Sequence, residues 1–196
     1  MRSIEVKLFH FNELSDKAKE KARIWWRHID DEIQSQGEMF ESLHALFNAA
    51  GVKLKDYQLG LGSYSFIKAE FNNEEIGHLS HGRAIGWLEN NLLSKIRITR
   101  KEYLANRKAY LSYGSLYRIG KVKPCPFTSM CWDDTFLDAL LHNIKQGSTL
   151  QRAFNELAST YVNCLQDEYD YQSSNEYIDD LLTANEYEFT ENGKHY

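Results

Sequence analysis

The chain has 196 residues, of which 42% are hydrophobic, and its formal net charge is −5 at pH 7. This length accommodates one generous domain or two small ones, and the composition is ample for a buried core. No stretch approaches the ~20 apolar residues of a membrane-spanning helix, the N-terminus carries no apolar leader, and three cysteines are too few for a secreted disulfide scaffold, so we expect a cytosolic protein with reduced thiols.

The first half of the chain predicts a strand, two helices and a hairpin. Residues 3–11 alternate between apolar and polar side chains, as a half-buried strand does. Residues 16–34 keep helical spacing behind Ser15 as the N-cap, and a second amphipathic helix ends at Gly51. Two β-rich runs, residues 52–61 and 63–71, then meet at a glycine-rich turn, which predicts a hairpin.

The second half is predicted to be mostly helical. Residues 79–96 read as a helix, residues 100–111 as a short basic helix, and residues 133–145 as a helix stopped by Gly147. Ser148 then begins a longer helix with apolar residues at positions 150, 154, 157, 161 and 164. We interpret this stripe as core-facing, with a coiled-coil dimer seam as the alternative.

The chain is predicted to end in a strand that pairs with the first one. Asn192-Gly193 is the preferred pair for a type I′ turn, in which both central residues have positive φ. The fold class is therefore α+β, with a small antiparallel sheet formed by N-terminal, central hairpin and C-terminal strands and packed with amphipathic helices. We expect an α+β region at residues 1–123 and a helical region at residues 124–196, both within one domain.

Charge is separated along the sequence. Residues 95–123 hold nine Lys or Arg against one Glu, a net +8, and residues 161–196 hold nine Asp or Glu against one Lys, a net −8. Lys and Arg interleaved with tyrosines suit single-stranded nucleic acid. A second interpretation is that the basic segment binds an acidic protein surface. A third is that the basic segment and the acidic tail pair with each other, within one chain or across a dimer.

Eleven residues are our candidates for partner binding. Seven belong to the basic segment, Trp26 borders the predicted core stripe of its helix, and three carboxylates open the acidic tail. They are Arg97, Arg100, Lys101, Arg107, Lys108, Tyr110, Tyr113, Trp26, Asp167, Glu168 and Asp170. The acidic tail also suggests a mimic of nucleic acid, in which carboxylates replace phosphates.

Metal and catalytic motifs are weak. His78 and His81 lie three residues apart, but five residues separate Cys125 from Cys131, which is wider than structural zinc pairs. A catalytic set of Cys131, His142 and Asp133 or Asp134 has no recognisable local signature. We therefore predict no metal, no cofactor and no catalytic residue.

Two terminal segments carry a resemblance to known proteins. Residues 11–22 read FNELSDKAKEKA and residues 184–194 read ANEYEFTENGK. Both are similar to segments of small accessory proteins encoded by bacteriophages and prophages, which are sometimes labelled antitoxin-like. The resemblance implies a phage origin and transfers no catalytic residue.

This origin suggests a non-catalytic inhibitor that binds a host protein or a protein–nucleic-acid defence complex, as anti-CRISPR proteins do, in the bacterial cytoplasm. The alternative is an antitoxin-like or regulatory nucleic-acid-binding protein that uses residues 95–123.

Overall fold

The chain divides into two compact units. The computed structural model describes residues 6–29, 33–62, 64–98 and 122–196. One unit consists of residues 1–34 and 166–196, and the other of residues 35–165; we name them the terminal unit and the central unit. This division differs from the predicted boundary at 123/124, because the two ends of the chain share one unit.

Two short strands from opposite ends of the chain close the terminal unit. β1 (Leu8–His10) pairs antiparallel with β4 (Glu188–Thr190), as the sequence predicted. Two helices, α1 (Asp16–Ile29) and α11 (Asn175–Ala184), pack together beside them. Their buried apolar core comes from α1, the turn before it, α11 and β4: Phe11, Leu14, Ala18, Ala22, Ile178, Leu182 and Phe189.

The turn after β4 lies where the sequence placed it but has a different geometry. Gly193 has a φ of +81°, whereas Asn192 is not among the residues with positive φ, so the type I′ prediction is wrong. The Gly193 amide donates to Thr190 O at 2.8 Å and the Thr190 amide donates to Lys194 O at 2.9 Å. This is the pattern of a type I turn followed by a left-handed glycine. Gly193 lies directly on α1, because a Cβ added there would be 2.1 Å from Ala18 O.

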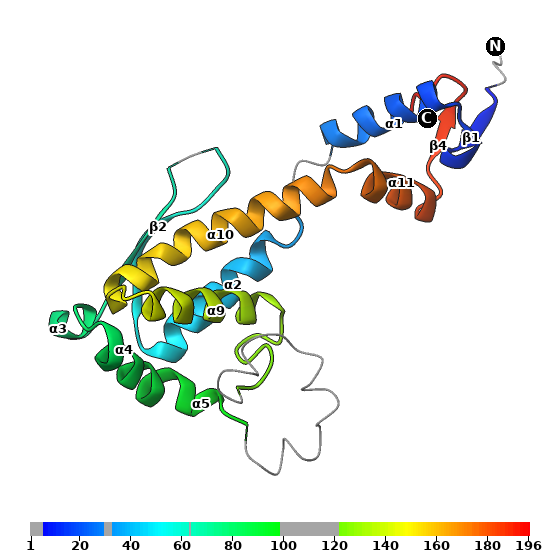
Figure 1. Cartoon of the computed structure of the whole chain (residues 1–196). Coiled ribbons are helices and arrows are strands. Elements are labelled where there is room, and N and C mark those ends of the chain that lie inside the picture. The colour runs from blue at the N-terminus through cyan, green and yellow to red at the C-terminus, as the bar shows by residue number, and fades with distance from the viewer. Residues whose placement is uncertain (1–5, 30–32, 63, 99–121) are drawn as a thin grey trace. The chain divides into compact units, whose positions relative to one another are not determined.

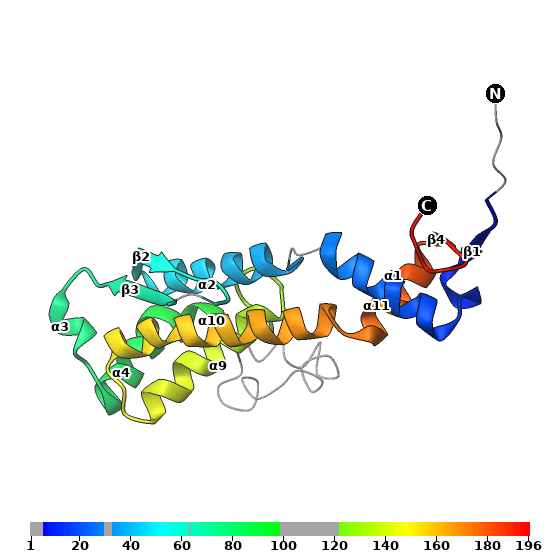
Figure 2. The ribbon, with the colours of Figure 1, turned by 90° about the horizontal axis from the view of Figure 1, so that it is seen from above.

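Three helices form the body of the central unit. In Figures 1 and 2, α2 (Gln36–Ala50) and α9 (Trp132–Lys145) run beside α10 (Leu150–Gln172), whose residues up to 165 belong to this unit. Phe47 meets Phe154 with ring centroids 5.0 Å apart. The predicted stripe faces this core over most of its length, since Leu150, Phe154, Leu157 and Tyr161 are buried, whereas Cys164 at its end is half-buried.

A hairpin and a broken helix complete the central unit. β2 (Lys53–Gln58) and β3 (Phe66–Glu70) pair antiparallel, as predicted. After α3 (Glu74–Gly77), the predicted helix at residues 79–96 is confirmed. It runs as α4 (His81–Leu88), a π-helical stretch (Glu89–Leu93) and α5 (Ser94–Ile96). The predicted basic helix at residues 100–111 lies outside the described residues.

A buried carboxylate holds the loop before α9. Asp133 is 0% exposed, and its side chain accepts hydrogen bonds from the amides of Phe127 and Thr128 at 2.8 and 2.7 Å and from the Thr128 hydroxyl at 2.8 Å. Thr128 Oγ1 lies 2.9 Å from Ser42 Oγ on α2. The loop is thereby joined to two helices of the core, and Asp133, a member of the rejected catalytic set, has a structural role.

The α+β prediction is confirmed, with antiparallel strands from the N-terminus, the centre and the C-terminus. The strands pair as two separate ribbons, β1 with β4 and β2 with β3. No helix among the described residues combines the length and the apolar character needed to cross a membrane.

Candidate functional site

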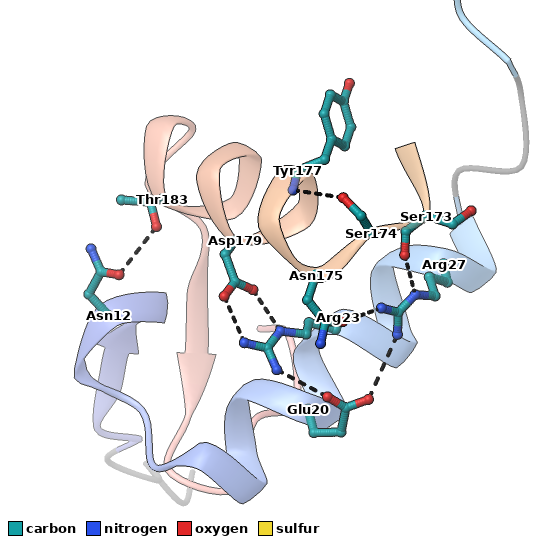
Figure 3. Close-up of polar contacts among 10 residues, drawn as sticks. All are labelled: Asn12, Glu20, Arg23, Arg27, Ser173, Ser174, Asn175, Tyr177, Asp179 and Thr183. Atoms are coloured by element: carbon teal, nitrogen blue, oxygen red, sulfur yellow. Dashed lines mark hydrogen bonds and ion pairs between the residues drawn. The ribbon is translucent and has the colours of Figure 1, made fainter. Parts of the chain in front are cut away.

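An arginine–carboxylate pair fastens α1 to α11. Arg23 donates from Nε to Asp179 Oδ1 at 2.6 Å and from Nη2 to Asp179 Oδ2 at 2.7 Å, the two-point geometry of a strong ion pair. A third bond from Arg23 reaches Glu20 at 3.1 Å. The hydrogen bonds to Asp179, ahead of those to Glu20, raise the pKa of Arg23. Figure 3 shows the guanidinium between these two carboxylates.

A second arginine of α1 holds the connection between α10 and α11. Arg27 donates to the Ser173 carbonyl at 3.1 Å and to Asn175 Oδ1 at 2.5 Å. Ser174 caps α11, because its hydroxyl accepts from the Tyr177 amide at 3.2 Å. The orientation of α11 on α1 is therefore fixed by side chains from both helices.

Trp26 lies in an aromatic cluster. Its ring meets Trp25 and Tyr187 with centroid distances of 6.1 and 5.6 Å, and the side chain is half-buried. Trp25 stacks on His195 with centroids 4.1 Å apart. Packing thus occupies much of the indole of Trp26, and only its remaining surface is accessible to a partner.

The solvent side of α10 and α11 carries acidic residues and a tyrosine. Asp167, Asp170 and Tyr171 fall within about 100° of arc on α10, and Glu176 and Asp180 are one turn apart on α11. All five are exposed; we name them the C-terminal acidic face. The two parts meet where the rings of Tyr171 and Tyr177 touch, with centroids 5.1 Å apart.

The carboxylates of this face are available for binding. Within the described part of the chain, Asp167, Glu176 and Asp180 form neither a hydrogen bond nor an ion pair through their carboxylates. Among the same described residues, the Asp170 carboxylate accepts a hydrogen bond from Gln166 alone, at 2.8 Å. The terminal unit has eight Lys or Arg against sixteen Asp or Glu, a net −8, whereas the central unit has fifteen against twelve, a net +3. The negative field of the protein is concentrated on the unit that carries this face.

The predicted partner-binding residues have different fates. Asp167 and Asp170 belong to the face, whereas Glu168 is half-buried and accepts from Gln172 at 2.8 Å within α10. Arg97 is paired with Glu89. The other six lie outside the described residues: Arg100, Lys101, Arg107, Lys108, Tyr110 and Tyr113.

The cysteines and histidines do not assemble a reactive centre in the described chain. Desolvation, followed by the charges of Asp134 and Asp133, raises the pKa of Cys125 to about 11, which keeps it a thiol at neutral pH. No group of three or more His, Cys, Asp or Glu capable of holding a metal ion is found among the described residues.

Comparison of the chain with protein-family models, with curated proteins and with solved structures finds no match.

Sequence reasoning missed part of this site. Tyr171, Glu176 and Asp180 lie within the predicted acidic tail but are not among the eleven predicted contact residues. Helical spacing could have found them. Positions 167, 170 and 171 lie on one side of a predicted helix, and positions 176 and 180 are spaced as neighbours on one side of the next helix. The Tyr171–Tyr177 contact that joins the two parts crosses a turn, and no sequence pattern indicates it.

Proposed function

We propose that the chain is a non-enzymatic accessory protein of phage origin that binds and inhibits a host defence complex through its C-terminal acidic face. The partner surface is basic, of the kind that holds nucleic acid in a defence complex. The protein occupies this surface in place of nucleic acid and acts in the cytoplasm of the host cell.

One observation carries the proposal: the face combines unpaired carboxylates with an exposed aromatic ring. Tyr171 is 58% exposed, directly after Asp170 and one helical turn beyond Asp167. Tyrosine is enriched among the residues that dominate binding energies, and unpaired carboxylates attract a basic partner at long range. In contrast, the carboxylates of Asp179 and Glu20 are used inside the unit.

The position of the phage-like segments supports the same proposal. Residues 11–22 contribute the start of α1, and residues 184–194 contribute β4 and the turn whose Gly193 lies on Ala18. Both segments therefore belong to the unit that presents the acidic face. The resemblance and the candidate surface coincide in one folded part of the molecule.

A pull-down from lysates of defence-bearing host strains tests the proposal. The test variant replaces Asp167, Glu176 and Asp180 with Lys, and the matched control replaces Glu41, Asp56 and Glu75, exposed carboxylates of the central unit, with Lys. Both variants change the net charge equally. We expect the control to capture the same partner as the wild type and the test variant to lose it; equal capture by both variants would contradict the proposal.

A further inference from the structure

Two cavities of the central unit share His78. The first has a volume of about 510 Å³ and lies among β3, α3 and the start of α10. The second, about 460 Å³, is lined by residues 78–83, at the beginning of α4. Each falls within the ~300–1,000 Å³ range of small-molecule sites. Because both are lined by His78, the two cavities are neighbours.

The first cavity contains two side-chain amides with unused hydrogen-bonding groups. Asn155 Oδ1 accepts from the Ala69 amide at 2.9 Å, and Gln151 Nε2 donates to the Ala69 carbonyl at 2.7 Å. These bonds hold both side chains against β3. Gln151 Oε1 and Asn155 Nδ2 have no hydrogen bond to the rest of the described chain, and neither atom is buried. The cavity thus offers one acceptor and one donor from preoriented amides.

A glycine keeps this cavity open. Gly77 lines it, and a Cβ at that position would be 3.1 Å from Gln151 Oε1 and 3.4 Å from Phe71. Any side chain at position 77 would therefore crowd the free acceptor.

The second cavity is cationic. Arg83 lines it, is exposed, and makes no ion pair with another described residue. His81 is held in place, since its ring packs against Gly147 and its Nδ1 lies 3.2 Å from Ser80 Oγ. Gly82 has open space where a side chain would project. Arginine and histidine side chains beside an open backbone suit a phosphate group.

The charges of the first cavity largely compensate one another. Glu70 lies between two lysines, at 2.5 Å from Lys55 Nζ and 3.5 Å from Lys53 Nζ. Lys68 and Glu74 supply one further charge of each sign. The net positive charge is therefore at the Arg83 end, and the polar, nearly neutral portion of a ligand fits at the Gln151 end.

We propose that the two cavities form one binding site for a nucleoside monophosphate. Its phosphate lies at Arg83 and His78, and its base lies beside Phe71 with a donor and an acceptor facing Gln151 Oε1 and Asn155 Nδ2. An asparagine or glutamine amide recognises adenine with one acceptor and one donor. Here Gln151 supplies the acceptor and Asn155 the donor, so AMP is the first probe. The site is independent of the C-terminal acidic face.

Isothermal titration calorimetry of the full chain with AMP tests the site, with CMP, GMP, UMP, adenosine, ribose 5-phosphate and inorganic phosphate as further titrants. We expect one AMP per chain, bound about tenfold or more tighter than adenosine or phosphate, because each lacks one half of the contacts. Absence of saturable binding by all four monophosphates would overturn the proposal. Equal affinity for AMP and phosphate would overturn the assignment of the first cavity.

Variants locate the site. Gly82→Asp places a carboxylate beside the proposed phosphate position, and its Cβ has no atom within 4 Å. It should abolish AMP binding, whereas Gly82→Asn should retain it. Arg83→Glu should also abolish binding, and Lys145→Glu, an exposed change on α9, should not. Equal AMP affinity in the two Gly82 variants would contradict the site. All these measurements use purified protein, so their outcome is separate from that of the pull-down.

Discussion

The terminal and central units use acidic residues in different ways. In the central unit Asp133, which is 0% exposed, organises a loop, and the partly exposed Glu70 is paired with two lysines. In the terminal unit Asp179 fastens α11 to α1 through Arg23, and Glu20 pairs with arginines of its own helix. The remaining carboxylates of this unit on α10 and α11 have no ion pair with a described residue. The carboxylates that stabilise the fold have hydrogen-bond donors or cations beside them. The carboxylates of the terminal unit that lack such neighbours are available for a partner.

Among the substitutions that test this comparison, Asp133→Ala in the central unit should cause the largest loss of stability. It removes the acceptor of two loop amides and one hydroxyl. The free energy of unfolding should fall by about 4 kcal/mol, because buried donors are left unsatisfied. Hydrogen-exchange mass spectrometry should show lost protection in the central unit. Asp134→Ala is the control, since among the described residues the Asp134 side chain accepts a hydrogen bond from the Cys125 amide alone, at 2.9 Å. This variant should lower the free energy of unfolding by about 1 kcal/mol. Equal costs for the two would refute the assigned role of Asp133.

Gly193→Ala should have the next largest effect, this time in the terminal unit. The added Cβ meets the backbone of Ala18 at 2.1 Å, and the φ of +81° disfavours any side chain. The expected loss is about 3 kcal/mol, from strain and displacement of the turn. Gly51→Ala is the matched control in the central unit, because φ is +70° there but no atom lies within 4 Å; it should cost about 1 kcal/mol. Chemical denaturation compares the two, and a Gly193 variant no worse than the Gly51 variant would show that the turn does not rest on α1.

A smaller effect is expected at the pair between Arg23 and Asp179. In a double-mutant cycle with Arg23→Met and Asp179→Asn, the coupling free energy should be about 1 kcal/mol, because the bidentate geometry strengthens a pair that remains partly exposed. The same cycle on Arg152 and Glu156, an exposed pair within α10, should give about 0.4 kcal/mol. A coupling at Arg23 no larger than at Arg152 would mean that the pair does not fasten α11 to α1.

Local features of the fold could be predicted from the sequence. Gly51 ends α2 in the left-handed conformation, Ser15 lies at the start of α1 with its hydroxyl 3.4 Å from the Ala18 amide, and alternation located β1. These features depend on neighbouring residues. The position of the turn at Asn192-Gly193 was predicted correctly, but its type was not. The turn packs against α1 as a type I turn followed by a left-handed glycine, and this contact is not visible in the sequence.

Features that join distant residues could not be predicted. Arg23 and Asp179 are 156 positions apart, and Gln151 and Ala69 are 82 positions apart. Many other arginines and amides have equal propensity for such contacts, so only the tertiary structure selects them. The acidity of the candidate site was evident from charge counts alone. Charge counts could not show which of these carboxylates are unpaired, because pairing depends on where α1 and its arginines lie.

The affinity of the proposed host partner, once captured and purified, for the charge-reversed proteins tests the central claim most directly. With Asp167, Glu176 and Asp180 changed to Lys, binding should weaken about a hundredfold, and the wild-type affinity should fall as salt rises, because the interaction is electrostatic. The control with Glu41, Asp56 and Glu75 changed to Lys should bind within about threefold of the wild type. Equal affinities of the two variants, or a wild-type affinity that does not respond to salt, would contradict docking through the C-terminal acidic face.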